Sequence, residues 1–330
     1  APALAVALDV EDLGALPEAD RAAEARRRAR DERDAPFDLA RGPLVRARLL
    51  RLAADEHWLF VTMHHIVTDG WSTGVLGHEL GALYGAFREG RPSPLPGLAI
   101  QYADYAASQR EEPDGDACTL ALAWWKDALA GLPSLDLPAD RPRAPIASHE
   151  GRCRTFEIDA GLARRLKDLA RRERVTPFMT LLAAFEVLLA RYSGQDDFAV
   201  GVPVAGRTRP ELEPLIGFFV NMLPMRADLS GRPTFVELLA RVRSRALDAY
   251  EHQGLPFERL VAELAPSRDA ARNPLFQVSF AVHHAGGAAW RLPGLAVEPL
   301  DAPGSESAKF DLSLTLTDAD GVLRGNLVGA

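Results

Sequence analysis

An apolar run that ends in two histidines and leads into a helix constrains the fold of this chain most. Residues 57–63, His-Trp-Leu-Phe-Val-Thr-Met, are aromatic and β-branched and predict a buried strand. His64 and His65 follow directly, and residues 71–88 then repeat leucine and phenylalanine at helical spacing. The stretch therefore predicts a strand, a histidine-bearing turn and a helix, which together form a unit of an α/β fold.

The two histidines are expected to differ in role. Side chains of a strand alternate between its faces, so His64 and His65 cannot both line one cavity unless the strand has already ended. A histidine accepts a proton near neutral pH, which suits an exposed one to general-base work. A pair of ordinary packed or surface histidines is the alternative. Zinc is disfavoured because no Cys/His cluster of ligand spacing accompanies the pair.

Composition narrows the class of protein. The 330 residues are 47% hydrophobic, enough for one large domain or two lobes with real cores. The net charge of 38 − 46 = −8 argues against a nucleic-acid surface. Cys118 and Cys153 are too few for a disulfide framework, so a reducing cytoplasm is expected. No apolar run reaches the roughly 18 residues of a membrane span, and no signal peptide opens the chain.

The remaining periodicity predicts alternating helices and strands. Residues 18–35 mix arginine with carboxylates and predict a solvated helix rather than a nucleic-acid patch. Residues 44–52 and 57–63 predict a hairpin that turns at 54–56. The prolines of 133–150 exclude regular structure and predict a linker between two lobes. Further helices are expected at 117–130, 160–174, from Pro177 onward and at 234–249, and further strands at 152–158, 197–204 and 310–317.

The segment His64-His65-Ile66-Val67-Thr68-Asp69-Gly70 resembles the His-His-x-x-x-Asp-Gly signature of the condensation domains of nonribosomal peptide synthetases, shared with chloramphenicol acetyltransferase-like acyltransferases. Four further segments resemble that family's elements in the same order. They are Tyr-x-Asp-(Phe/Tyr)-Ala at 102–106, (Ile/Val)-Gly-x-Phe-Val-Asn-Thr within 216–226, His-Gln-Asp-x-Pro-Phe-Glu at 252–258 and Arg-Asp-x-Ser-Arg-Asn-Pro-Leu within 268–278.

The chain departs from these patterns at three positions. Met222 stands for Thr, Gly254 for Asp and Ala271 for Ser. The run 216–226 is typical of a buried strand, but an asparagine in such a strand needs hydrogen-bond partners. Asn221 is therefore expected to face the channel that family members have between their two lobes. The second pair, His283-His284, lacks the following Asp-Gly and is expected to have no part in the chemistry.

The resemblance implies two chloramphenicol-acetyltransferase-like α/β lobes in a V, with a channel between them. The family's N-terminal elements are missing, and the chain starts with alanine in an apolar segment, so we expect a piece of a longer protein with an incomplete first lobe. We predict a partial N-terminal lobe at 1–132, the linker at 133–150 and a C-terminal lobe at 151–330.

The resemblance also implies a reaction in antibiotic and secondary metabolite biosynthesis. A donor acyl or peptidyl thioester and an acceptor aminoacyl thioester, each on the 4′-phosphopantetheine arm of a peptidyl carrier domain, form an amide. The expected partners are the upstream and downstream carrier domains and a neighbouring adenylation domain, with no intrinsic cofactor, metal, nucleic acid or membrane.

Residue roles follow from the same resemblance. His65 is expected to act as general base or to orient the amine. Gly70 permits a positive φ or close approach of a ligand. A separate hypothesis, which the resemblance does not supply, is that Gly70 lets the backbone lie beside the reacting centre, where an amide N–H stabilises the oxyanion. His64 is expected to be structural, and Asp69 to turn away and pair with an arginine. Candidate channel residues are Asn221, Trp71 and Ser72.

Several alternatives stay open. A free-standing acyltransferase using coenzyme A shares the histidine signature, although the later elements fit synthetases better. A non-catalytic carrier-docking module, or an inactive truncated fragment, is a second alternative. Heterocyclisation is disfavoured because that branch replaces both histidines with Asp, whereas epimerisation domains keep them.

Overall fold

The computed structural model describes residues 6–111, 115–140, 143, 150–265, 272–284, 290–300, 307–319 and 321–330. Contacts divide the chain into two compact units, each assembled from three stretches of sequence. The first unit contains 1–102, 211–219 and 288–302, and the second contains 103–210, 220–287 and 303–330.

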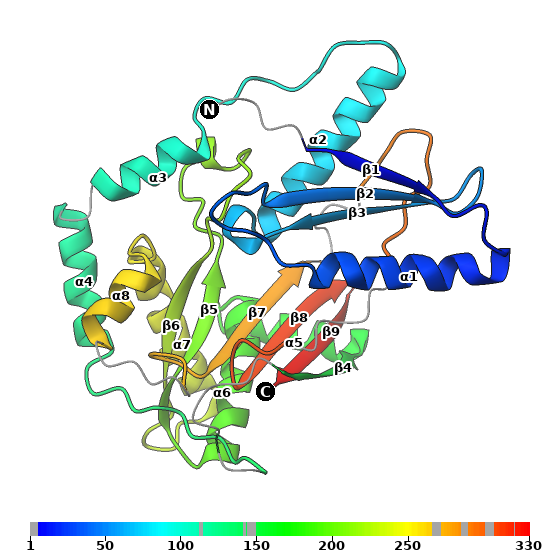
Figure 1. Ribbon diagram of the computed structural model, residues 1–330. Helices are drawn as coiled ribbons and strands as arrows, with labels where there is room; N and C mark the ends of the chain where they lie inside the picture. The colour runs from blue at the N-terminus through cyan, green and yellow to red at the C-terminus, as the bar shows by residue number, and fades with distance from the viewer. Residues whose placement is uncertain are drawn as a thin grey trace. The chain divides into compact units, whose positions relative to one another are not determined.

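The first unit is built on a three-stranded sheet in the order β1-β2-β3. Strand β1 (Leu8–Asp12) runs parallel to β2 (Val45–Arg51), and α1 (Glu18–Asp34) connects them. Strand β3 (His57–Met63) pairs antiparallel with β2, which confirms the predicted hairpin. Helix α1 lies along one face of this sheet (Figure 1), where Ala25 packs with buried leucines of the sheet and its loops. Strand β1 was not predicted.

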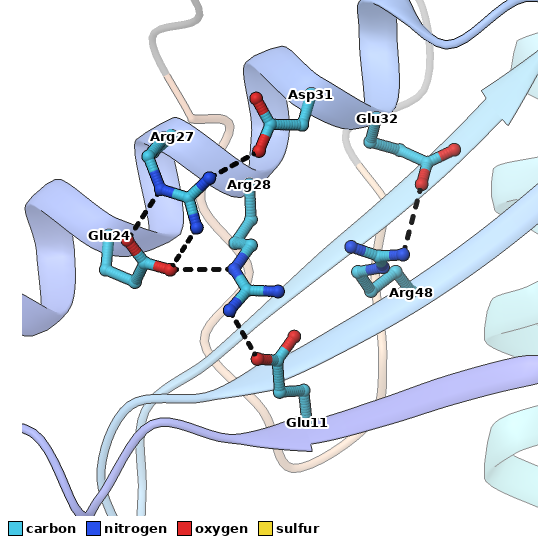
Figure 2. Close-up of polar contacts among 7 residues, drawn as sticks. All are labelled: Glu11, Glu24, Arg27, Arg28, Asp31, Glu32 and Arg48. Carbon is cyan, nitrogen blue, oxygen red and sulfur yellow. Dashed lines mark hydrogen bonds and ion pairs between the residues drawn. The ribbon is translucent and has the colours of Figure 1, made fainter.

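Helix α1 carries a network of ion pairs that extends to the neighbouring strands (Figure 2). Arg27 bonds to Glu24 at 2.6 Å and to Asp31 at 2.7 Å, and Arg28 bonds to Glu24 at 2.7 Å and to Glu11 of β1 at 3.0 Å. Hydrogen bonds from Arg27 and Arg28 lower the pKa of Glu24 to about 2. Arg27 and Arg28 are therefore paired within their own unit, and α1 is a largely exposed helix, which confirms the prediction of a solvated helix.

Helix α2 (Gly70–Arg88) follows the histidines and is covered on one side by residues that return from late in the sequence. A Cβ on Gly77 would lie 2.4 Å from the ring of Trp290, and one on Gly81 would lie 2.4 Å from the carbonyl oxygen of Arg291. The two glycines allow the 290–294 segment to lie against the helix backbone. Residues from the second half of the sequence thus pack against α2 as part of the first unit.

The second unit is built on a six-stranded mixed sheet in the order β4-β9-β8-β7-β5-β6. The strands are β4 (Arg152–Ile158), β5 (Asp197–Val204), β6 (Asn221–Asp228), β7 (Val278–His284), β8 (Leu312–Ala319) and β9 (Val322–Gly329). Helices α5 (Ala160–Arg172), α6 (Pro177–Ser193) and α7 (Phe235–Glu251) cover one face of the sheet (Figure 1). The other helices are α4 (Asp116–Ala128), α8 (Phe257–Leu264) and α3 (Tyr102–Glu111), whose first residue, Tyr102, belongs to the first unit.

The core of the second unit lies between this sheet and its helices. Phe198 and Phe280 of the sheet are fully buried, and Phe185 of α6 stacks on Phe280 with ring centroids 5.6 Å apart. Trp125 of α4 belongs to the same core, so residues 103–132 pack with the second unit. The lobe limits at 132 and 151 stay a prediction.

Most predicted elements are confirmed within a few residues. The strand expected from 216 is shorter and begins at Asn221, and residues 216–219 lie in the first unit. His283, which is expected to have no part in the chemistry, belongs to strand β7. In the described part of the Pro-rich stretch, residues 133–140 form neither helix nor strand, as predicted.

Among the described residues, no single helix is long and apolar enough to cross a membrane. Only α5 and α6 taken together meet the criteria of length and composition, and this pair is bent by 106°.

Candidate functional site

The histidines lie where strand β3 ends and the chain turns toward α2. His64 caps a single 3-10 turn, His65–Val67, and its Nδ1 accepts the Ile66 N–H at 3.1 Å. The His64 ring is half-buried and meets the ring of Phe37 edge to face, with centroids 5.9 Å apart. These contacts support the predicted structural role of His64.

His65 is exposed, and one hydrogen bond determines which of its ring nitrogens can accept a proton. Its Nδ1 lies 2.6 Å from the carbonyl oxygen of Thr68. A carbonyl oxygen has no hydrogen to donate, so Nδ1 must carry the proton in this bond. In the neutral ring the lone pair then lies on Nε2. In the neutral ring, Nε2 is therefore the nitrogen that can accept a proton.

Asp69 is buried at 3% exposure and stabilises the start of α2. Its Oδ1 accepts the Ser72 N–H at 2.8 Å, which is an N-cap, and its Oδ2 accepts the Phe219 N–H at 3.0 Å. Because Nδ1 of His65 bonds to Thr68 instead of to this carboxylate, these bonds do not form a His-Asp pair of a catalytic triad. An arginine partner for Asp69 stays a prediction.

Gly70 is the first residue of α2, and its φ is not positive. Of the two possibilities that a glycine offers here, the structure does not use the left-handed backbone, because a residue in the first helical turn takes the ordinary right-handed conformation. A Cβ built on Gly70 meets nothing within 4 Å. A side chain at position 70 would therefore occupy open space beside the turn and would not strain the backbone.

Two of the three candidate channel residues, Trp71 and Ser72, lie on the first turn of α2, and the polar groups of both side chains form hydrogen bonds with the backbone of residues 213–217. The Trp71 indole N–H donates to the carbonyl of Glu213 at 3.0 Å, and its side chain is half-exposed. Ser72 is fully buried, and its Oγ donates to the Gly217 carbonyl at 2.8 Å and accepts the Gly217 N–H at 3.1 Å. A channel contact for either stays a prediction.

Asn221, the third candidate, lies in the second unit and holds a loop. Its amide NH₂ donates to the carbonyls of Gln253 at 2.9 Å and Leu255 at 2.7 Å. Its Oδ1 accepts the N–H of Met222 at 3.0 Å and of Phe257 at 2.9 Å. These bonds satisfy a polar side chain within an apolar strand. They also link two of the segments that resemble family elements, 216–226 and 252–258. A channel role for Asn221 stays a prediction.

Three residues near the histidines were not predicted as part of the site. The Tyr102 hydroxyl donates to the Phe218 carbonyl at 2.8 Å, and the Phe218 ring meets the His65 ring with centroids 5.2 Å apart at 89°. Burial and the nearby Asp69 carboxylate raise the pKa of Tyr102. A Cβ on Gly217 would lie 2.1 Å from the Tyr102 ring. The signals were present in the segments at 102–106 and 216–226, but nothing in the sequence joined them to His65.

No group of three or more His, Cys, Asp or Glu side chains suited to a metal ion occurs among the residues that the structure describes.

Comparison with known proteins identifies the family. The family described as Condensation domain matches residues 2–327. The chain is 48% identical over 316 residues to chondramide synthase cmdD of Chondromyces crocatus, covering 96% of this chain and 8% of that protein. It is 49% identical over 297 residues to malpinin synthetase of Mortierella alpina, covering 90% of this chain and 4% of that protein. The chain thus spans less than a tenth of the length of these relatives.

Solved structures agree with this assignment. The X-domain from teicoplanin biosynthesis superposes with a TM-score of 0.87 at 32% identity, covering 99% of this chain and 74% of that one. The first condensation domain of the calcium-dependent antibiotic synthetase shares the fold, with a TM-score of 0.71 at 23% identity over 100% of this chain and 73% of that one. With a family match over nearly its whole length, this chain belongs to the condensation domains of nonribosomal peptide synthetases.

Proposed function

We propose that this chain forms an amide between a donor acyl or peptidyl thioester and the amine of an acceptor aminoacyl thioester, both held on 4′-phosphopantetheine arms of carrier domains. The observation that carries the proposal is the state of His65, whose Nδ1–H is bonded to Thr68 and whose Nε2 is left as the proton acceptor. Family membership supports the substrate class, since the domain acts within multidomain synthetases.

The proposed reaction requires one proton acceptor and correct alignment of the reactants. The acceptor amine attacks the thioester carbonyl carbon, the C–N bond forms, and the C–S bond breaks. His65 Nε2 takes the proton that the amine loses and returns it to the departing thiolate, so no net proton is consumed. A thioester is already activated, so holding two tethered reactants in contact supplies much of the rate.

Asp69 and Gly70, which lie at the start of α2, contribute to the proposed reaction by fixing and presenting the backbone of the helix. Asp69 fixes the first turn of α2 through the Ser72 N–H. Gly70 is exposed at the helix N-terminus, where the first N–H groups have no intrahelical acceptor, and its N–H is the proposed oxyanion donor. The proposal includes carrier and adenylation domains as partners and the cytoplasm as the compartment.

A non-catalytic docking function is the second candidate, and one comparison favours it. The teicoplanin X-domain, similar to this chain at 32% identity, is also known in a complex with OxyB. A related surface on this chain would serve recruitment instead of turnover.

The natural full-length polypeptide distinguishes the candidates. Donor and acceptor are loaded on their own carrier domains, and product is followed by mass spectrometry of the released thioester. Amide formation that needs both carriers supports condensation. Equal turnover with coenzyme A thioesters and no carriers would favour a free-standing acyltransferase. Carrier binding without turnover would favour docking.

A further inference from the structure

We infer that Phe218 is a positioning residue for His65, and that residues 217–219 form a clamp that holds the imidazole in one orientation. The inference rests on the proposed function, because it names a residue that prepares the base of that reaction. In the pattern (Ile/Val)-Gly-x-Phe-Val-Asn-Thr, Phe218 occupies the unspecified position, so the resemblance assigns it nothing.

The clamp is attached through its backbone. Both backbone groups of Gly217 bond to the Ser72 hydroxyl, at 2.8 and 3.1 Å. The carbonyl of Phe218 accepts the Tyr102 hydroxyl at 2.8 Å, and the N–H of Phe219 donates to Asp69 at 3.0 Å. Ser72 and Asp69 are buried, so these bonds are shielded from competition by water. Gly217 and Phe219 are thereby fixed to the start of the helix that follows the histidines, and Phe218 between them is fixed to Tyr102.

The two adjacent phenylalanines then face different partners. Phe219 is 3% exposed, and its ring meets the Tyr102 ring edge to face at 5.1 Å. Phe218 is half-buried, and its ring meets the His65 ring edge to face at 5.2 Å. The first ring anchors the clamp in the unit, and the second lies on the base.

Two contacts together fix an imidazole better than one. The bond from Nδ1–H to Thr68 leaves the ring free to tilt about the line of that bond. The Phe218 ring restricts this tilt, and a ring flip about the Cβ–Cγ bond, which would carry Nδ1 away from the Thr68 carbonyl, would have to break both contacts. The consequence is a single tautomer with Nε2 held in one direction, which is the preorganisation that a general base needs.

The absence of a side chain at Gly217 allows the clamp to lie directly against the Tyr102 ring. A Cβ there would lie 2.1 Å from the Tyr102 ring, so any side chain would push Tyr102 away from the Phe218 carbonyl. The glycine is buried, and its φ is not in the left-handed region. It is required for close packing.

The test compares three variants in the natural full-length polypeptide. Phe218→Leu removes the ring on His65, Phe218→Tyr keeps it, and Phe219→Leu removes an aromatic ring from the same clamp without touching the imidazole. The first readout is ¹⁵N NMR of the histidine ring nitrogens, assigned with a His65→Gln sample, which reports the tautomer without any substrate. The second is single-turnover condensation, with the rate and the carrier concentration for half-saturation measured separately.

We expect wild type and Phe218→Tyr to show the Nδ1–H tautomer alone, and Phe218→Leu to show averaging of the two ring nitrogens. The loss of one aromatic contact should slow turnover about two- to tenfold with half-saturation unchanged. Phe219→Leu should keep the tautomer even if it unfolds more easily. An unchanged His65 spectrum in Phe218→Leu overturns the inference. A changed spectrum in a chain that never condenses substrates supports the clamp and refutes the proposed function instead.

Discussion

Glu186 of helix α6 makes the stability of the second unit depend on pH. Its carboxyl group is buried at 2% exposure among core residues, and its Oε2 has no hydrogen-bond partner within the described part of the chain. Burial raises the pKa of Glu186 from 4.5 to about 8, because a charged carboxylate in this core would lose its hydration. The folded chain therefore keeps a proton that the unfolded chain releases.

The direction and the size of the pH effect on the free energy of unfolding follow from this difference in pKa between the folded and unfolded chain. Because the pKa is higher in the folded state, the stabilisation is complete below pH 4.5 and is lost as the pH rises toward 8. Within that window the free energy of unfolding should fall by about 1.4 kcal/mol per pH unit, or roughly 2–3 kcal/mol between pH 5 and pH 7. Glu186→Gln keeps the shape and cannot ionise, so it should lack this contribution.

Urea unfolding at pH 5, 6, 7 and 8, followed by tryptophan fluorescence, measures the effect, since Trp125 lies in the same core. The unfolding free energy of Glu186→Gln minus that of the wild type should grow by about 2–3 kcal/mol from pH 5 to pH 7. Glu251→Gln, at an exposed position of α7, is the matched control and should follow the wild type. Parallel pH profiles for the wild type and Glu186→Gln would refute the reasoning.

Two further substitutions test the contacts that assemble each unit. Asn221→Ala should destabilise the second unit by about 2–4 kcal/mol in urea unfolding, because it leaves the Gln253 and Leu255 carbonyls and the Phe257 N–H without the amide; a loss below about 0.5 kcal/mol would contradict the role in the loop. Gly81→Ala should destabilise the first unit by about 1–3 kcal/mol and increase hydrogen exchange at 290–294, because its Cβ would lie 2.4 Å from the Arg291 carbonyl oxygen. Gly97→Ala, where a Cβ meets nothing within 4 Å, is the control, and equal exchange in both variants would show that the 290–294 segment does not depend on Gly81.

Local patterns in the sequence were enough to predict most elements. The apolar run 57–63, the Thr176-Pro177 start of α6 and the arginine-rich α1 each follow from neighbouring residues, and the structure confirms them. Strand β1 was missed because only part of it is apolar and its pairing partner lies after a helix. Gly70 permitted either a positive φ or close approach of a ligand, and the sequence alone did not reveal that the helix already begins there with an ordinary φ.

The site itself depends on contacts that no local pattern contains. Asp69 meets the Phe219 N–H across 150 positions, and Ser72 meets Gly217 across 145. These contacts also engage the N–H groups of residues 217 and 219, and β6 begins only at Asn221, opposite the last residue of β5. The His65 tautomer depends on one carbonyl orientation at Thr68, and a sequence does not specify that orientation.

Single-turnover condensation with both carriers loaded, comparing His65→Ala with His64→Ala in the natural full-length polypeptide, tests the proposed role of His65 most directly. We predict that His65→Ala slows amide formation about 10²-fold or more with carrier binding unchanged, since general-base loss has effects of that size. His64→Ala should act mainly by destabilising the turn, because its ring nitrogen caps the turn through the Ile66 N–H. A His65→Ala rate within a few-fold of the wild type would contradict the role of Nε2 as the proton acceptor.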